Sequence, residues 1–404
     1  MTDTATNTAT NSATNGTTTD TASAAGGVPT DQGPPDRGTP DRGRADQSLG
    51  EGFSVRRAHA LVADLFTPRP AVYWADLAAS YAVFAAAFWA ARPAGYTTPA
   101  GILLTAVATL AAYRCAAFIH ELSHLRTRRA LRRFRWGWNA LVGIPFMIPA
   151  FMFDAHVKHH SVRTYGTRDD PEYRPLERLT RGRALAFLGM SFALPLLAPV
   201  RFGLLTPVSL VNARLRRHLH AHLATLKFDF DYVGGPPTDR RQARAWLVQE
   251  LACTLWVAAG AALLFTGTVT VQRAVQGYAV FSGLLLVNAI RTLVSHRWGG
   301  NEEPMSLVEQ MADSINFPRR PLLTELWAPL GLRLHALHHL FPGLPYHALP
   351  EAHRRLTAAL PPGSPYHRTA GTGLAASLAA LWRGTAHRGP SLPPPRRGGP
   401  LTTP

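Results

Sequence analysis

The sequence predicts an all-α integral membrane protein with four transmembrane helices in two hairpins, interfacial helices and a helical cap on the cytoplasmic side. Three observations support this prediction. Four apolar stretches approach the roughly 20 residues that a helix needs to cross a bilayer. Arginines gather at one end of these stretches, and three histidine clusters lie near the same end. The four stretches are residues 72–91, 99–119, 247–267 and 274–294.

The hairpins follow from the short breaks between paired stretches. Pro93, Gly95 and Pro99 separate the first pair, and residues 268–273 connect the second pair. Proline and glycine favour helix ends, because proline lacks a backbone N–H and glycine adopts conformations that other residues avoid. Each pair is therefore expected to enter the membrane and return to the side from which it started.

Three other apolar segments are predicted to contact the membrane without crossing it. Residues 53–66 mix apolar and basic side chains, which is typical of an interfacial helix. Residues 140–153 are too short to cross. Residues 184–211 are long enough, but Pro195 and Pro199 interrupt them. A single crossing there would also place the second and third histidine clusters on opposite sides of the membrane.

The two ends of the chain differ in composition from its central part, residues 53–360. Residues 1–52 are rich in Thr, Ala, Asn, Gly and Pro and contain no apolar run, so we expect a disordered tail that is not a secretory signal. Residues 361–404 are rich in Pro, Gly and Arg. We expect them to form a flexible tail with one short surface helix at residues 374–382.

The net charge of +17 is compatible with nucleic-acid binding, but the positions of the charges argue against it. Arginines cluster after the second apolar stretch and before the third, whereas the loops at residues 92–98 and 268–273 hold one arginine each. This is the positive-inside pattern. It predicts a multi-pass protein of the cell membrane with both termini and all three histidine clusters in the cytoplasm. The basic side would face anionic lipid, with no nucleic-acid partner.

Eight histidines occur in three clusters with helical spacing. Side chains at positions i, i+3 and i+4 share one face of a helix, so each cluster can direct its imidazoles to a common point. Imidazole binds iron, zinc, copper and nickel, and eight imidazoles exceed the four ligands of a tetrahedral zinc ion. The spacing therefore predicts two metal ions. The three clusters are His120 and His124; His156, His159 and His160; and His335, His338 and His339.

Two other interpretations of the histidines are open. The first cluster also reads His-Glu-x-x-His, which is the motif of zinc metalloproteases with Glu121 as general base. A protease would leave most of the other histidines without a role. A metal-binding membrane protein without enzymatic activity would not need three such clusters. Outside the clusters, His218, His220 and His222 alternate in a basic segment and are expected to face solvent or lipid.

The three histidine boxes, in this order, resemble those of the integral-membrane fatty acid desaturase family of bacterial type. Asp170-Pro171-Glu172 after the second box and the Leu340-Phe341-Pro342 that closes the third box also match that family, as do residues 299–318. The resemblance covers about residues 53–359 and neither tail. It implies that His296, directly after the fourth stretch, is a ninth metal ligand.

The resemblance implies two iron ions, O2 as oxidant, and an acyl-chain lipid substrate in which the enzyme introduces a C=C double bond. The sequence has no dinucleotide-binding fingerprint and no cysteine set for an iron–sulfur cluster. Electrons are therefore expected from a separate carrier, a ferredoxin or similar protein with its reductase, docked on the arginine-rich face. Related di-iron hydroxylases and ketolases, which act on alkanes, carotenoids or sphingolipids, share the histidine framework and are the alternative.

Several neighbours of the histidines are expected to support the metal site. Ligand imidazoles usually donate their second N–H to a carboxylate or carbonyl, and Glu121 and Asp170 are the candidates for this role. In some relatives an Asn one helical turn before the ninth histidine holds a metal-bound water. Thr292 occupies that position here, and Asn288 and Asn301 are the possible substitutes.

Overall fold

The computed structural model describes residues 53–387, except 178 and 301. The predicted disordered tail at residues 1–52 and the last residues of the chain, 388–404, lie outside this range. Within it, the backbone is helical and its only extended pairings are isolated β-bridges, such as that between His296 and Ser314. The all-α prediction is therefore confirmed for the part of the chain that the structure describes.

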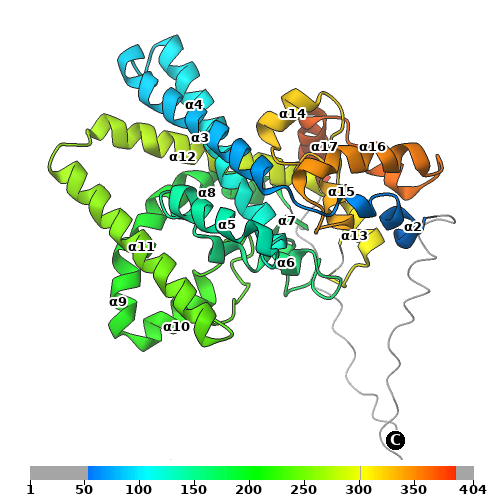
Figure 1. Ribbon diagram of the computed structural model, residues 1–404, viewed down its shortest axis with the longest axis horizontal. Helices are drawn as coiled ribbons and strands as arrows, with labels where there is room; N and C mark the ends of the chain where they lie inside the picture. The colour runs from blue at the N-terminus through cyan, green and yellow to red at the C-terminus, as the bar shows by residue number, and fades with distance from the viewer. Residues whose placement is uncertain (1–52, 178, 301, 388–404) are drawn as a thin grey trace, which may run out of the picture. The chain divides into compact units, whose positions relative to one another are not determined.

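Five helical segments within residues 53–387 are long and apolar enough to cross a membrane. Four of them lie at the predicted stretches (Figure 1). The helices α3 and α4 pack as a hairpin, whereas α11 and α12 are joined by a short turn but diverge from it. The fifth segment covers the residues that were expected to enter the membrane without crossing. The segments are α3 (Pro70–Ala94), α4 (Pro99–His124), Arg181–Val211, α11 (Arg240–Phe265) and α12 (Val271–Ser295).

The turn between α3 and α4 shows how local sequence sets this hairpin. Gly95 ends α3 with a φ of 82°, a left-handed conformation that glycine adopts without steric cost. Thr98 then caps α4 by accepting a hydrogen bond from the backbone N–H of Gly101, and Pro99 occupies the first helical position. The two helices pack against each other along their length.

The Arg181–Val211 segment is more regular than its sequence predicts. It consists of α8 (Arg181–Val200), a π-helical turn η5 (Arg201–Leu205) and α9 (Thr206–Val211), and it continues through Pro195 and Pro199. The expected interruption at these prolines is wrong. In an apolar environment, a helix that satisfies its remaining backbone hydrogen bonds internally is more stable than a break that exposes them.

Beyond this fifth segment, the chain returns toward the start of α8. After α9, the chain turns at Asn212 into α10 (Ala213–His222). Phe187 near the start of α8 then contacts Phe228 beyond α10, with ring centroids 5.0 Å apart. Leu226 donates its backbone N–H to the carbonyl oxygen of Met152, at 2.7 Å. The chain beyond α10 therefore returns to the region where the segment started.

The remaining helices are short and surround the histidines. Residues 140–153, the predicted interfacial region, contribute a π-helical turn and a 3-10 turn to this set. These elements are α2 (Val55–Ala60), η1 (Ala63–Leu65), η2 (Arg129–Leu131), α5 (Arg132–Trp138), η3 (Asn139–Gly143), η4 (Ala150–Phe153), α6 (His156–His159), α7 (Arg174–Glu177), α13 (Leu307–Asp313), α14 (Pro321–Trp327), α15 (His335–Leu340), η6 (Tyr346–Ala348), α16 (Leu349–Ala359), η7 (Pro365–Thr369) and α17 (Leu374–His387).

Two segments outside the spans pack differently from the prediction. Phe53, Ala58 and Val62 are buried in a hydrophobic cluster with α15 and α16, so the N-terminal segment contacts protein through these side chains. Tyr366, from the region expected to be a flexible tail, is 1% exposed in the same cluster. Farther on, α17 packs against α8 and α12. Composition does not reveal these contacts, because they join residues that are distant in the sequence.

Candidate metal centre

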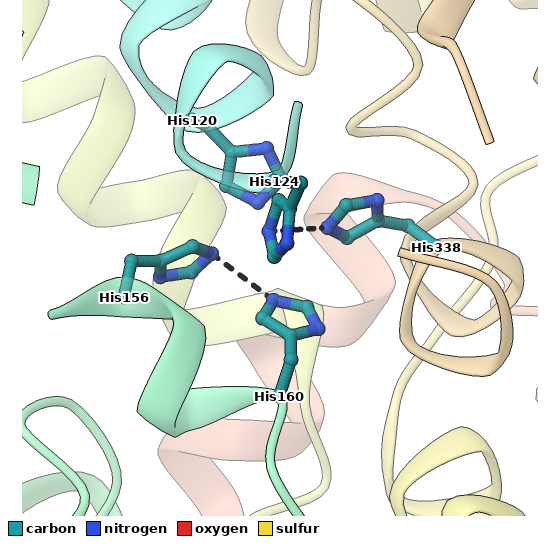
Figure 2. Close-up of side chains that lie close together, drawn as sticks. All are labelled: His120, His124, His156, His160 and His338. Atoms are coloured by element: carbon teal, nitrogen blue, oxygen red, sulfur yellow. Dashed lines mark hydrogen bonds between the residues drawn. The ribbon is translucent and has the colours of Figure 1, made fainter. Parts of the chain in front are cut away.

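The structure brings all nine predicted histidines together in two adjoining groups. In each group, the candidate ligand atoms lie within 4.8 Å of one another. The five-histidine group, shown in Figure 2, consists of His120, His124, His156, His160 and His338. The four-histidine group consists of His159, His296, His335 and His339.

The second and third boxes are each divided between the groups. His156 and His160 belong to the five-histidine group, whereas His159 belongs to the four-histidine group. In the third box, His335 and His339 share one group and His338 joins the other. The expectation that each box converges on one point is therefore wrong. Residues i and i+4 stay together in both boxes, and the residue at i+3 projects to the other group.

The histidines come from helix ends and short helices that meet in one place. His120 and His124 occupy the last turns of α4, and His296 directly follows α12. The second and third boxes form or begin α6 and α15. Eight of the nine side chains are buried, and only His124 is half-buried. The centre is therefore shielded from solvent except at one ligand of the five-histidine group.

Carboxylates and a tyrosine hold the outer nitrogens of three imidazoles. His156 Nδ1 lies 2.6 Å from a Glu172 oxygen, and His159 Nδ1 lies 2.9 Å from an Asp170 oxygen. His296 Nδ1 lies 2.9 Å from the hydroxyl of Tyr165. These contacts fix the imidazole orientations and leave Nε2 of each ring directed inward, as in protein metal sites.

The inward nitrogens approach one another in a way that a bound cation would explain. His156 Nε2 lies 3.0 Å from His160 Nε2, and His335 Nε2 lies 3.0 Å from His296 Nε2. Because His156 donates Nδ1–H to Glu172, its Nε2 carries a lone pair. Four other ring nitrogens are buried without any hydrogen-bond partner: His120 Nε2, His160 Nδ1, His335 Nδ1 and His339 Nδ1. Nine imidazoles gathered in two groups fit metals that prefer nitrogen ligands, including iron.

Burial also favours the protonation state that binds metal. It lowers the pKa of His160, His335 and His339 well below the usual value for histidine, because the charged imidazolium is poorly solvated there, and neighbouring histidines lower it further. Burial lowers the pKa of His296 to about 4, although Asp313 opposes this shift. These imidazoles are therefore neutral at physiological pH, which is the form that coordinates a metal.

The neighbours predicted from sequence are partly correct. Asp170 contacts His159 as expected. Glu121 instead accepts hydrogen bonds from the Tyr73 hydroxyl, at 2.5 Å, and from the backbone N–H of Tyr346, at 3.0 Å. Its hydrogen bonds involve no histidine, so its expected role beside a ligand is wrong. The same arrangement disfavours the protease interpretation, which needs this carboxylate beside the metal.

Sequence reasoning missed three supporting residues. Glu172 was part of a recognised motif, and its spacing of two from Asp170 was a usable signal for a second carboxylate contact. Tyr165 donates its hydroxyl hydrogen to Asp313 Oδ2, at 2.8 Å, while it contacts His296. No local pattern indicated Asp313, because folding alone brings it to Tyr165 from 148 positions away in the sequence.

Of the two proposed substitutes for a water-binding Asn, the structure describes only Asn288, which is engaged elsewhere. Thr292 and Asn288 both accept hydrogen bonds from Arg291, and Asn301 lies outside the described residues. The alternating histidines lie on α10 and belong to neither group, as expected.

An apolar cavity of about 340 Å³ opens between α8, α12 and α17. Leu188, Leu293 and Leu381 are among its lining residues. Leu293 precedes His296 by one helical turn, and its carbonyl oxygen accepts a hydrogen bond from the Trp298 indole. The cavity therefore places hydrocarbon-compatible surface on the same helix end that carries a ligand of the four-histidine group.

Comparison with known proteins identifies the family. The sequence matches the fatty acid desaturase family over residues 96–370. The chain belongs to this family. It is also 43% identical over 329 residues to a ceramide hydroxylase of Caulobacter vibrioides, in an alignment that covers 81% of this chain and 93% of that protein. As a member of the fatty acid desaturase family, the chain is an oxidoreductase of a histidine-ligated di-iron class that uses O2 and lipid substrates in a membrane. The resemblance noted in the sequence is confirmed.

Proposed function

We propose that this chain is a membrane di-iron hydroxylase that acts on ceramide or a closely similar N-acyl lipid. The observation that carries the proposal is the 43% identity to a ceramide hydroxylase over 93% of that protein's length. This choice favours the alternative over the double-bond formation that the sequence motifs first indicated. Desaturation of an acyl chain is the second candidate, supported by the family match over residues 96–370.

In this proposal, the five-histidine group holds one iron and the four-histidine group holds the other. The two irons would supply the oxidising power for an unactivated C–H bond, which side-chain acids and bases cannot supply. Hydroxylation consumes the lipid, O2, two electrons and two protons, and it yields the hydroxylated lipid and one water. One oxygen atom enters the broken C–H bond, and the other leaves as water.

The side chains around the histidines would orient the ligands and exclude water. Asp170 and Glu172 hold the Nδ1–H of His159 and His156, so that Nε2 of each ring is free for metal. Tyr165 and Asp313 fix the orientation of His296. The Asp170 carboxylate is also anchored by the backbone N–H groups of Gly166 and Glu172.

Electrons would reach the centre on the side of the five-histidine group. His124 is its half-buried ligand, and the chain that follows it carries exposed arginines, namely Arg126, Arg128, Arg129, Arg132 and Arg133. A basic surface beside the most accessible ligand favours an acidic protein carrier, such as a ferredoxin reduced by its own reductase. These arginines would also contact anionic membrane lipid.

We also propose a cell-membrane topology with four crossings and a cytoplasmic metal centre. Arg181–Val211 would enter the membrane without crossing, because the chain beyond α10 returns to the region before and at the start of α8: Phe228 contacts Phe187, and Leu226 bonds to Met152. The proposed catalytic domain begins near residue 53. It extends beyond residue 360 as far as α17, because α17 packs against α8 and α12.

The test is to express the chain with a ferredoxin and its reductase in a host that contains ceramide, beside the same host expressing His339→Ala. Mass spectrometry of the lipids should show a ceramide heavier by one oxygen atom only with the intact chain. That oxygen should carry the label when the cells receive isotopically heavy O2. A product that has lost two hydrogens without gaining oxygen would show desaturation and refute the hydroxylase proposal.

A further inference from the structure

One buried arginine beside the metal centre has no negative partner. Arg291 lies in the last turns of α12, five residues before His296, and is 9% exposed. Its terminal nitrogens donate to neutral oxygens only: Nη2 to Asn288 at 3.2 Å and to Thr292 at 3.0 Å, and Nη1 to Ser295 at 3.5 Å. Its Nε is buried and has no hydrogen-bond partner.

Two of the other three buried arginines of the described chain pair with carboxylates, and the third has neutral partners. Arg201 lies 2.7 Å from a Glu250 oxygen, and Arg333 lies 3.2 Å from a Glu325 oxygen. Arg273 donates to the carbonyl oxygen of Phe88 at 2.7 Å and lies 4.5 Å from the centre of the Trp89 ring. Among the residues that the structure describes, no carboxylate lies within ion-pair distance of Arg291. Among the four buried arginines that the structure describes, Arg291 therefore differs in combining the lack of a carboxylate partner with a buried Nε that has no hydrogen-bond partner.

The guanidinium of Arg291 lies within electrostatic reach of both histidine groups. Its positive charge contributes to the lowered pKa of His335 in the four-histidine group and of His338 in the five-histidine group, where burial is the first cause. The same charge opposes the increase that burial causes in the pKa of Glu172. The charge therefore acts on the region where a substrate must meet the metal centre.

An unpaired charge in such a place needs a ligand. Arginine stays protonated in proteins, and burying its charge without a partner is costly. Two metal cations nearby would add repulsion. Ionisable side chains within membrane helices usually mark substrate or ion sites, because few other roles compensate for their burial. The free Nε–H shows which part of the guanidinium is available.

We propose that Arg291 binds the amide end of the lipid substrate, with its Nε–H donating to the amide carbonyl oxygen. Both Nη2 hydrogens already bond to Asn288 and Thr292, and one Nη1 hydrogen bonds to Ser295, so that Nε–H and the second Nη1–H remain. These two donors do not form a parallel pair, because each parallel pair of a guanidinium includes Nη2. A carboxylate or phosphate would instead be bound through two parallel donors. A neutral amide is therefore the better match, and it is the polar group that a ceramide carries.

This inference rests on the proposed function and adds a prediction of where the reaction occurs. Arg291 lies on α12 five positions before His296, the residue that directly follows this helix, and four of these positions span roughly 6 Å along the helix axis. An amide held at Arg291 would keep the neighbouring carbons close to the four-histidine group. The new hydroxyl should therefore lie within the first few carbons from the amide, and the far ends of the hydrocarbon chains should stay unmodified.

The test compares Arg291→Gln with the wild-type chain and with Arg273→Gln, a buried arginine at the opposite end of the same helix. Each full-length protein is loaded with iron in nanodiscs, and binding of fluorescent ceramide is measured without reductant, so that no turnover occurs.

Iron content and thermal unfolding are measured on the same samples. We expect Arg291→Gln to weaken ceramide binding by about 10- to 100-fold, the usual effect of losing a hydrogen bond from a charged group. Iron content should be unchanged, and Arg273→Gln should bind as the wild type does.

The outcomes separate this inference from the proposed function. If Arg291→Gln binds ceramide as tightly as the wild type does, the inference is refuted. This holds even when the wild type hydroxylates ceramide. If Arg291→Gln bound ceramide normally but hydroxylated it more slowly, the charge of Arg291 would act on the metal centre and not on the substrate. That result would also refute the inference. Tandem mass spectrometry of the wild-type product supplies a second check, because a hydroxyl near the far end of either chain contradicts the proposed anchor. A wild-type chain that neither binds nor hydroxylates ceramide refutes both proposals.

Discussion

The two histidine groups use the same ligand type, but the protein holds them differently. The four-histidine group is fully buried, and its His159 and His296 are fixed by Asp170 and by Tyr165 with Asp313. The five-histidine group has one more imidazole, one carboxylate contact at His156, and the half-buried His124 beside exposed arginines. Under the proposed function, the four-histidine group would hold its iron rigidly with fewer ligands, and the more accessible five-histidine group would receive electrons.

The largest expected effect comes from removing one ligand of each group. His335→Ala leaves three imidazoles in the four-histidine group, so we expect one of two irons to be lost. His338→Ala leaves four imidazoles in the other group and should retain most of its iron. Both variants should lose lipid hydroxylation. Metal content per chain, measured by mass spectrometry, checks this. Equal iron loss in both variants would contradict the difference between the groups.

Substitutions of Asp170 and Glu172, the carboxylates that contact ligand imidazoles, should lower iron affinity less than loss of a ligand does. The four-histidine group should again be the more sensitive of the two. Asp170→Asn should lower iron affinity by about 10- to 100-fold, because it disturbs both the orientation of His159 and two backbone hydrogen bonds. Glu172→Gln removes one contact, to His156, in a group with five imidazoles, and should lower affinity less. Competition with a chelator measures both variants. A larger loss of iron affinity for Glu172→Gln than for Asp170→Asn would contradict the proposal that the four-histidine group is the more rigid one.

Electron entry can be tested without touching a ligand. Reversing charge at Arg126 and Arg132 should raise the KM for an acidic ferredoxin by about tenfold at low salt, and the effect should shrink as salt increases. Iron content and ceramide binding should stay unchanged. Arg56→Glu, an exposed arginine on α2, is the matched control. If the control raises KM equally, the surface beside His124 has no special role.

Glu121 belongs to neither support network, and its change should affect metal binding least. Glu121→Gln should keep both irons and lipid hydroxylation, while lowering the free energy of unfolding by about 1–3 kcal/mol, because buried partners at Tyr73 and Tyr346 lose a charged acceptor. Thermal unfolding and metal analysis measure this. If Glu121→Gln lost lipid hydroxylation while its fold stayed intact, Glu121 would take part in the reaction. The protease interpretation would then be open again.

The prediction from sequence succeeded where the signal is local. Apolar stretches of bilayer length located α3, α4, α11 and α12, because each helix satisfies its own backbone hydrogen bonds. Histidines at i, i+3 and i+4 identified eight members of the centre. The ninth, His296, came only from family resemblance, since a single histidine after a helix carries no spacing signal.

The prediction failed where distant segments meet. The regular path through Pro195 and the burial of Tyr366 both depend on surroundings that composition does not describe. Glu121 was assigned to the histidines because it neighbours His120 in sequence, yet adjacent residues on a helix point about 100° apart. Its carboxylate bonds to Tyr73 and Tyr346 instead.

The sequence by itself determined the membrane helices, the number of imidazoles and the type of metal they suit, because these depend on hydropathy and on ligand chemistry. Only the tertiary structure decided how the imidazoles divide into two groups, and that Glu172 and Asp313, in place of Glu121, join Asp170 in orienting them. It also showed that Arg291 stands buried beside them without a negative partner. Those features arise from contacts between α4, α6, α12 and α15, and no local pattern encodes the position of one helix end against another.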